Sequence, residues 1–111
     1  MAIPHLQSGD KTQLCPAADN AAPVAARALF KTPAMEAMLL NLPAGKHIAE
    51  HQVAGPITLQ CLSGTASIEA VNTRKELRTG ELMFLEAGAP HAVYAQSDCS
   101  LLVTIALNAA G

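Results

Sequence analysis

The sequence predicts an all-β protein, an antiparallel sandwich or small barrel that forms one domain. From Val24 onward, short apolar runs alternate with turn residues roughly every 8 to 12 positions, which is typical of such folds. Pro43, Pro56 and Pro90 fall at the ends of these runs, where a missing N–H removes no central ladder bond. A length of 111 residues, with 50% hydrophobic and 14% charged residues, suits a single domain with its own core.

The first 23 residues do not share this pattern. They are rich in Ala, Pro, Asp and Asn, and residues 8–10 and 16–20 are typical of loops. Residues 20–29 would favour a helix on propensity alone, but Pro23 interrupts this short stretch. We therefore expect an N-terminal arm over residues 1–23 and one barrel domain over residues 24–111.

The predicted strands are apolar or alternating runs, and the turns between them contain Gly, Pro, Asn or Asp. Alternation turns Leu59 and Cys61 inward on one strand, and Leu101, Val103 and Ile105 inward on the last, so we expect a hydrocarbon inner wall. The predicted strands span residues 26–31, 35–42, 47–51, 57–63, 65–71, 76–78, 82–86, 92–95 and 99–107.

Composition excludes several classes of function. The net charge is −2, and the basic residues of segment 74–78 form no stripe that could follow a phosphate backbone, so we expect no nucleic-acid partner. The chain begins without a signal-like segment and has no apolar run of about 18 residues, which predicts a cytoplasmic protein with no membrane partner. Cys15, Cys61 and Cys99 have no short spacing between them and are expected to be reduced thiols.

Two glycine-and-histidine frames lie within the strand region. They run Gly45-x5-His51-x-Val53-x3-Ile57-x6-Gly64 and Gly80-x5-Glu86-x-Gly88-x2-His91. Together they resemble the two motifs of the cupin superfamily, in which the first motif supplies His, His and Glu to a metal ion and the second supplies one more His. The likeness covers roughly residues 24–107 and is strongest to the small single-domain bacterial cupins of the RmlC-like type. It implies a double-stranded β-helix, or jelly-roll, barrel.

The resemblance places two metal ligands, at His51 and His91. Val53 and Ile57 occupy the positions of the second His and the Glu, and neither side chain can coordinate a metal ion. A bis-histidine site would therefore bind Zn, Ni or Fe weakly or not at all, and water would have to complete the coordination. The alternative is a pair of histidines that hydrogen-bond to water or to backbone carbonyls without a metal ion.

Two further polar residues are candidate ligands. Alternation puts His47 on the face of His51, but four strand residues separate them by about 13 Å, too far to share one ion. Gln60 would turn inward only if a bulge near Gly55 and Pro56 reversed the alternation, and it is a tentative third ligand on that condition.

The cupin resemblance leaves two functions open. One is a protein that binds a metal ion or a small molecule in the barrel without catalysis. The other is a metal-dependent enzyme, an oxygenase or isomerase, that uses His51 and His91. We also expect a homodimer, because residues 26–31 and 35–42 carry more apolar surface than one sheet face can bury.

Overall fold

The computed structural model describes residues 5–14 and 25–107. Over these residues the regular secondary structure consists of β-strands, and no helix is present that could span a bilayer. The strands are β1 (Ala25–Lys31), β2 (Met35–Leu42), β3 (His47–His51), β4 (Ile57–Ser63), β5 (Thr65–Ala70), β6 (Thr73–Arg78), β7 (Leu82–Leu85), β8 (His91–Ala95) and β9 (Cys99–Ala106).

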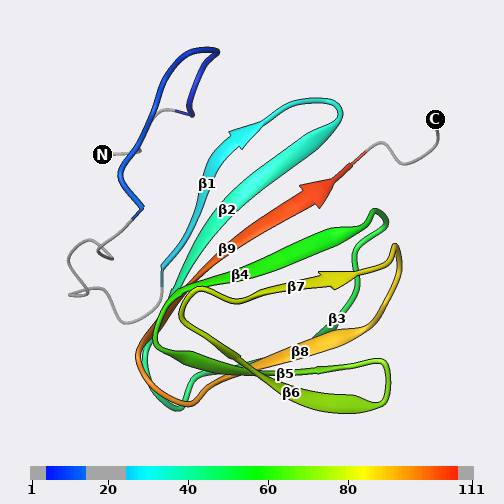
Figure 1. The fold of residues 1–111 in the computed structure, drawn as a ribbon. Helices are drawn as coiled ribbons and strands as arrows, with labels where there is room; N and C mark the ends of the chain where they lie inside the picture. The colour runs from blue at the N-terminus through cyan, green and yellow to red at the C-terminus, as the bar shows by residue number, and fades with distance from the viewer. Residues whose placement is uncertain (1–4, 15–24, 108–111) are drawn as a thin grey trace.

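The strands form two antiparallel sheets that face each other (Figure 1). One sheet has the order β1-β2-β9-β4-β7 and the other has the order β3-β8-β5-β6. This confirms the predicted antiparallel jelly-roll architecture, but the barrel is not closed: the edge strands β6 and β7 do not pair with each other, and neither do the edge strands β1 and β3. Lys75 and Glu76 line the gap between these two edges, and charged side chains of this kind discourage edge pairing.

The largest difference from the predicted strands concerns β5 and β6. The prediction continued the first strand through Val71 and began the next at Glu76, whereas the structure pairs Ala70 with Thr73 and makes Val71 and Asn72 the turn. Both turn residues have positive φ angles, 53° and 61°. Valine favours strands, so its residue type argued for the wrong position of the turn.

The main core fills the space between the sheets and is aliphatic, as predicted. Every second side chain of a strand points into this space. β4 shows the pattern most clearly, with Ile57, Leu59 and Cys61 buried. The buried members of this cluster are Leu42, Ile57, Leu59, Cys61, Ala66, Ile68, Leu77, Leu85, Val93, Ala95, Cys99, Leu101, Val103 and Ile105.

A second, smaller cluster lies on the outer face of β1 and β2. Leu29, Ala37 and Leu39 are buried there, and Leu6 and Leu14 pack against them. The backbone N–H of Leu6 donates to the carbonyl of Leu29 at 2.8 Å. Residues 5–14 therefore cover part of the apolar surface that the sequence analysis assigned to a partner, while the predicted boundary between residues 23 and 24 lies outside the described residues.

Candidate functional site

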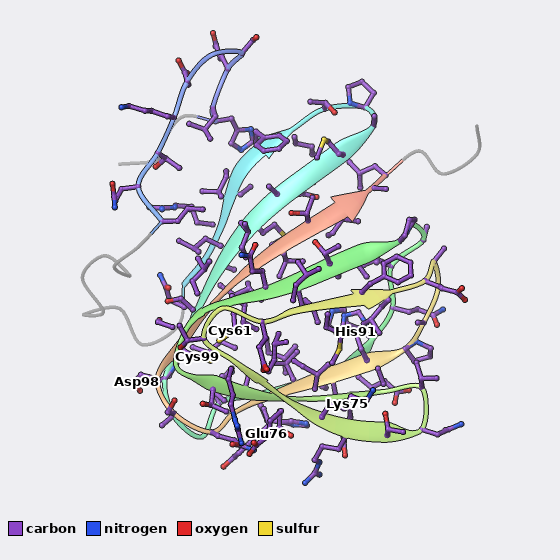
Figure 2. The ribbon with its side chains drawn as sticks, viewed as in Figure 1. Cys61, Lys75, Glu76, His91, Asp98 and Cys99 are labelled. Atoms are coloured by element: carbon purple, nitrogen blue, oxygen red, sulfur yellow. The ribbon has the colours of Figure 1, made fainter. Side chains whose placement is uncertain are left out.

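The structure brings His51 and His91 together. They are register partners at the C-terminal end of β3 and the N-terminal end of β8, and their ring centroids lie 4.2 Å apart at an interplanar angle of 57°. His91 is 2% exposed and lies between the sheets (Figure 2), whereas His51 is exposed. The pair thus consists of one buried imidazole and one imidazole that is exposed to solvent.

A β-bulge in β3 sets the direction of these side chains. Ile48 pairs with Val93 and His51 pairs with His91, so β3 carries one more residue than β8 between the two pairs. Ile48 packs against the core, and the extra residue allows His51 to face the same side. Simple alternation would have placed them on opposite faces.

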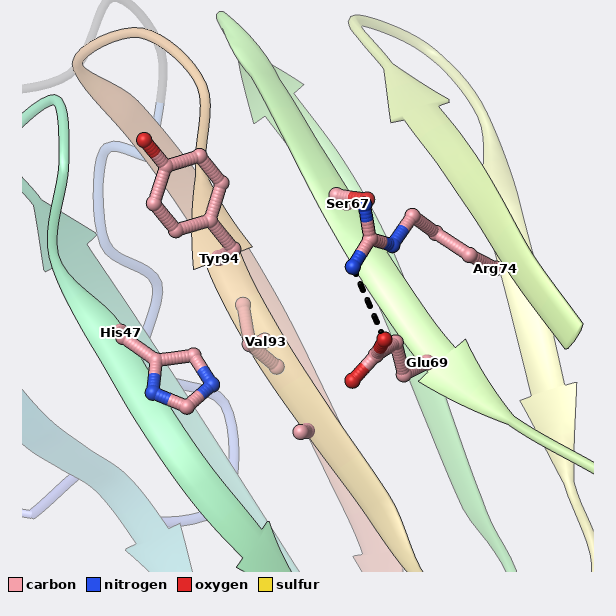
Figure 3. A pocket seen from close by; sticks show the side chains of 7 residues that line it. His47, Ser67, Glu69, Arg74, Val93 and Tyr94 are labelled. Atoms are coloured by element: carbon pink, nitrogen blue, oxygen red, sulfur yellow. Dashed lines mark hydrogen bonds and ion pairs between the residues drawn. The ribbon is translucent and has the colours of Figure 1, made fainter. Parts of the chain in front are cut away.

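The bulge corrects the prediction for His47. Alternation without a bulge put His47 on the face of His51, but the structure places it on the outer face, beside its register partner Tyr94 (Figure 3). Neither Gly nor Pro marks the bulge in the sequence, so nothing in the turn chemistry signalled it.

Both histidine rings are held by the same local contact. Nδ1 of His51 lies 3.1 Å from the carbonyl oxygen of Ala49, and Nδ1 of His91 lies 3.1 Å from the carbonyl oxygen of Ala89. A carbonyl oxygen only accepts hydrogen bonds, so Nδ1 is the protonated nitrogen in each neutral ring. Nε2 of each ring then keeps its lone pair, and this is the arrangement that metal-binding histidines commonly show.

The remaining candidate ligands do not join the pair. Gln60 pairs with Leu82 and Leu102, and it faces outward because Leu59 and Cys61 face the core. Gln60 would have turned inward only if β4 had a bulge before it, near Gly55 and Pro56. The register shift of β4 lies after it instead, between Cys61 and Ser63. Among residues 5–14 and 25–107, no cluster of three or more His, Cys, Asp or Glu could hold a metal ion.

The side chains at the two remaining motif positions are apolar and pack in the core. Ile57 is 3% exposed within the core, and Val53 is partly buried against the same cluster. They occupy the positions at which the first cupin motif has its second His and its Glu. At the four motif positions, the chain therefore offers two imidazole nitrogens and two hydrocarbon side chains.

The two described cysteines lie at the opposite end of the sandwich from His91 (Figure 2). Both are free and buried. Burial raises the pKa of the Cys61 thiol, whose single S–H can donate to the carbonyl oxygen of Ser63 or of Gly64, each 3.3 Å from Sγ. Burial also raises the pKa of Cys99 to about 11, with smaller contributions from Cys61 and Asp98. Neither thiol is poised as a thiolate ligand.

Lys75 is a residue that the sequence analysis missed on the inner face. It pairs with Ile68, which is buried between the sheets, and it lines a cavity of about 280 Å³ together with Met83 and Leu85. The predicted strand began at Glu76, which left Lys75 in a loop. Alternation back from Leu77 would have assigned Lys75 to the inner face if the strand had been started at Thr73.

Solved structures with similar folds cover most of the chain. A conserved protein of unknown function from Streptococcus pyogenes matches with a TM-score of 0.76 and 22% identity over 96% of this chain and 94% of its own. An RmlC-like cupin protein from Desulfovibrio desulfuricans matches with a TM-score of 0.76 and 19% identity over 87% and 96%. No protein-family model matches the sequence, and no curated protein does.

An enzyme is also among the similar structures. The DMSP lyase DddQ from Ruegeria pomeroyi matches with a TM-score of 0.71 and 22% identity over 80% of this chain and 49% of its own. This chain thus spans about half of the lyase, and at such identities the likeness concerns the fold alone. Taken with the two facing antiparallel sheets, these matches identify the chain as a small domain with the RmlC-like cupin fold.

Proposed function

We propose that this domain binds a divalent transition metal ion, of the Zn²⁺, Ni²⁺ or Fe²⁺ class, through Nε2 of His51 and Nε2 of His91. The observation that carries the proposal is that both rings make the same kind of contact with the backbone. Each Nδ1 faces a backbone carbonyl at 3.1 Å, which leaves both Nε2 atoms as acceptors on neighbouring rings 4.2 Å apart. Imidazole nitrogen is a ligand that suits all three of these metals.

The donor set fits a weak, open site. A tetrahedral ion takes four ligands, and the chain supplies two, so water or a small exchangeable molecule would fill the other positions. Val53 and Ile57 add no charge to neutralise the ion, which lowers the affinity further. A reversible binding module suits these features better than a permanent metal cage does.

Calorimetric titration of untagged protein with Zn²⁺ and Ni²⁺ tests the proposal. His51→Ala and His91→Ala should each weaken binding by at least about tenfold, because each removes one of two ligands. His47→Ala is the matched control, since His47 lies on the same strand but on the opposite face. Equal weakening by His47→Ala, or none by His51→Ala, would show that the metal binds elsewhere.

Acidification gives a second measurement on the same protein. Protons compete with the metal for the neutral imidazole rings, so affinity should fall and proton release should accompany binding at neutral pH. A metal affinity that does not change with pH would contradict ligation by histidine.

An enzyme built on the same pair is the second candidate, and Lys75 is the observation that favours it. Lys75 is exposed and lines the cavity of about 280 Å³ beside Ile68, so its amine could serve as a base toward a substrate bound in that cavity. In that case Lys75→Met should abolish turnover by the metal-loaded protein and leave metal affinity unchanged. A binding module would show no turnover in either form.

A further inference from the structure

The outer face of the four-stranded sheet carries a hollow that is separate from the histidine pair. Ala92 and His91 are neighbours on β8 and face opposite sides of the sheet, so the floor of the hollow is the back of the strand that holds the buried imidazole. The hollow has a volume of about 200 Å³ (Figure 3). Its lining side chains include His47, Ser67, Glu69, Arg74, Ala92 and Tyr94, from four adjacent strands.

The hollow exists because Ala92 is short and its neighbours are long. Ala92 pairs with Glu69, and on the next position of this face Tyr94 pairs with both His47 and Ser67. A methyl group among longer side chains leaves a depression on a pleated sheet.

An unpaired hydroxyl lies at the base of the hollow. Ser67 is 4% exposed, and its Oγ is buried without a hydrogen-bond partner among the described residues. Buried polar atoms are nearly always paired, because a hydroxyl that gives up water without a new partner is destabilising. Ser67 lines the hollow, so its Oγ would gain a partner if a group that enters the hollow displaced the side chains that cover this atom.

The wall above Ser67 combines a donor and an acceptor in a fixed pair. The Arg74 guanidinium donates to the Glu69 carboxylate at 2.9 Å, and both side chains remain more than half exposed. Their charges cancel, so an anion would be repelled by the Glu69 carboxylate and a cation would be repelled by the Arg74 guanidinium. A hydroxyl group suits both, since it can accept from the guanidinium and donate to the carboxylate.

Tyr94 supplies an apolar surface on the other side. Its ring is 45% exposed and belongs to β8 beside His47. Aromatic rings present a flat face to C–H groups and a polar hydroxyl at their tip. The hollow thus offers one apolar wall, one wall with paired charges, and a hydroxyl at the base.

We propose that this hollow binds a neutral, hydroxyl-rich small molecule of the size of one sugar ring. A volume of about 200 Å³ is below that of pockets for drug-sized ligands and suits a single ring. Vicinal hydroxyls would engage Arg74 and Glu69 together, and a further hydroxyl would pair with Ser67 Oγ. The site does not depend on metal binding by the histidines, which face the other side of the sheet.

Backbone-amide NMR titrations of ¹⁵N-labelled protein test this with D-glucose, D-galactose and myo-inositol, compared with acetate and gluconate. We expect saturable shifts of the Ser67, Ala92 and Tyr94 amides with a neutral probe, and weaker shifts with the two carboxylates. No saturation by any neutral probe at 100 mM, stronger binding of a carboxylate, or shifts confined to His51 and His91 would each overturn the proposal.

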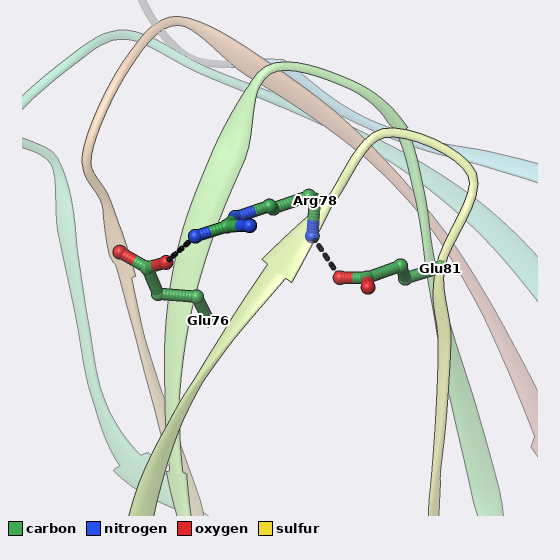
Figure 4. Close-up of polar contacts among 3 residues, drawn as sticks. All are labelled: Glu76, Arg78 and Glu81. Atoms are coloured by element: carbon green, nitrogen blue, oxygen red, sulfur yellow. Dashed lines mark hydrogen bonds and ion pairs between the residues drawn. The ribbon is translucent and has the colours of Figure 1, made fainter.

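Substitutions locate the binding on this face. Ala92→Leu should fill the hollow and abolish the shifts, and Ser67→Ala should weaken binding by about tenfold through loss of one hydrogen bond. Glu76→Gln is the matched control: Glu76 is the register partner of Ser67 but does not line the hollow, and its carboxylate pairs instead with Arg78 at 2.8 Å (Figure 4). Binding that survives Ala92→Leu, or that Glu76→Gln weakens as much as Ser67→Ala does, would refute the site.

Discussion

Replacing Gly64 with alanine should destabilise the domain strongly, for two separable reasons. Gly64 has a φ of +79°, and an L residue in this left-handed region costs about 1–2 kcal/mol. An added Cβ would also collide with the carbonyl oxygen of Asp98 and lie 2.8 Å from Cβ of Cys99. Overpacking of this kind costs about 1–3 kcal/mol, and here the obstacle is partly backbone, which cannot rotate away. We expect a total loss of about 2–5 kcal/mol, a large part of the roughly 5–15 kcal/mol that stabilises a domain.

Gly80→Ala separates the two causes. Gly80 has a similar φ of +89°, but a Cβ there would meet no atom within 4 Å. It should lose only the conformational part, about 1–2 kcal/mol. Urea unfolding followed by circular dichroism gives both free energies of unfolding. If the two variants lose equal stability, the close approach of Asp98 to Gly64 is wrong.

Three further predictions concern stability and assembly. Val71→Asn should raise the free energy of unfolding by about 1 kcal/mol, because asparagine tolerates positive φ and the Val71 side chain is 73% exposed; a lower thermal midpoint would contradict this. The pKa of Cys99 is raised from 9.0 to about 11, so folding favours the protonated thiol, and its stabilising contribution should be present below about pH 9 and disappear as the pH rises toward about 11. Urea midpoints at the two pH values should therefore differ less in Cys99→Ala than in the wild type, and an identical pH dependence would refute the assignment. The homodimer stays a prediction: β1 is an edge strand, and light scattering at micromolar concentration should give a dimer mass, whereas a monomer mass would exclude pairing through this edge.

The fold could be predicted because its signals are local and repeated. Glycines, prolines and short polar segments mark the ends of strands, and the bounds predicted for β2, β3 and β4 agree with the structure. The turn at Val71 was missed because its conformation is imposed by the pairing of β5 with β6 and opposes the preference of the residue. The open gap between β6 and β7 depends on how two sheets meet in space, which no local pattern records.

The candidate site could be predicted only in part. The resemblance of the two frames to the cupin motifs implied His51 and His91 as a pair, and the structure places their rings side by side. Lys75 was missed because a strand start was placed too late by three residues, at Glu76 instead of Thr73. The hollow over Ala92 was missed for a different reason. It needs the register of four strands, and the residues that line it are individually ordinary surface residues.

The bulge in β3 connects both proposed sites to the core. Ile48 and His51 are three positions apart, and in a regular strand such residues face opposite sides. The core needs Ile48 inside, and the pairing with His91 needs His51 inside, so a regular strand could satisfy only one of these requirements. One extra residue satisfies both, and it leaves His47 on the outer face, where it lines the hollow. The two imidazoles of β3 therefore serve different faces of one sheet, and a mutation that changed the register at Ala49 or Glu50 should disturb both faces together.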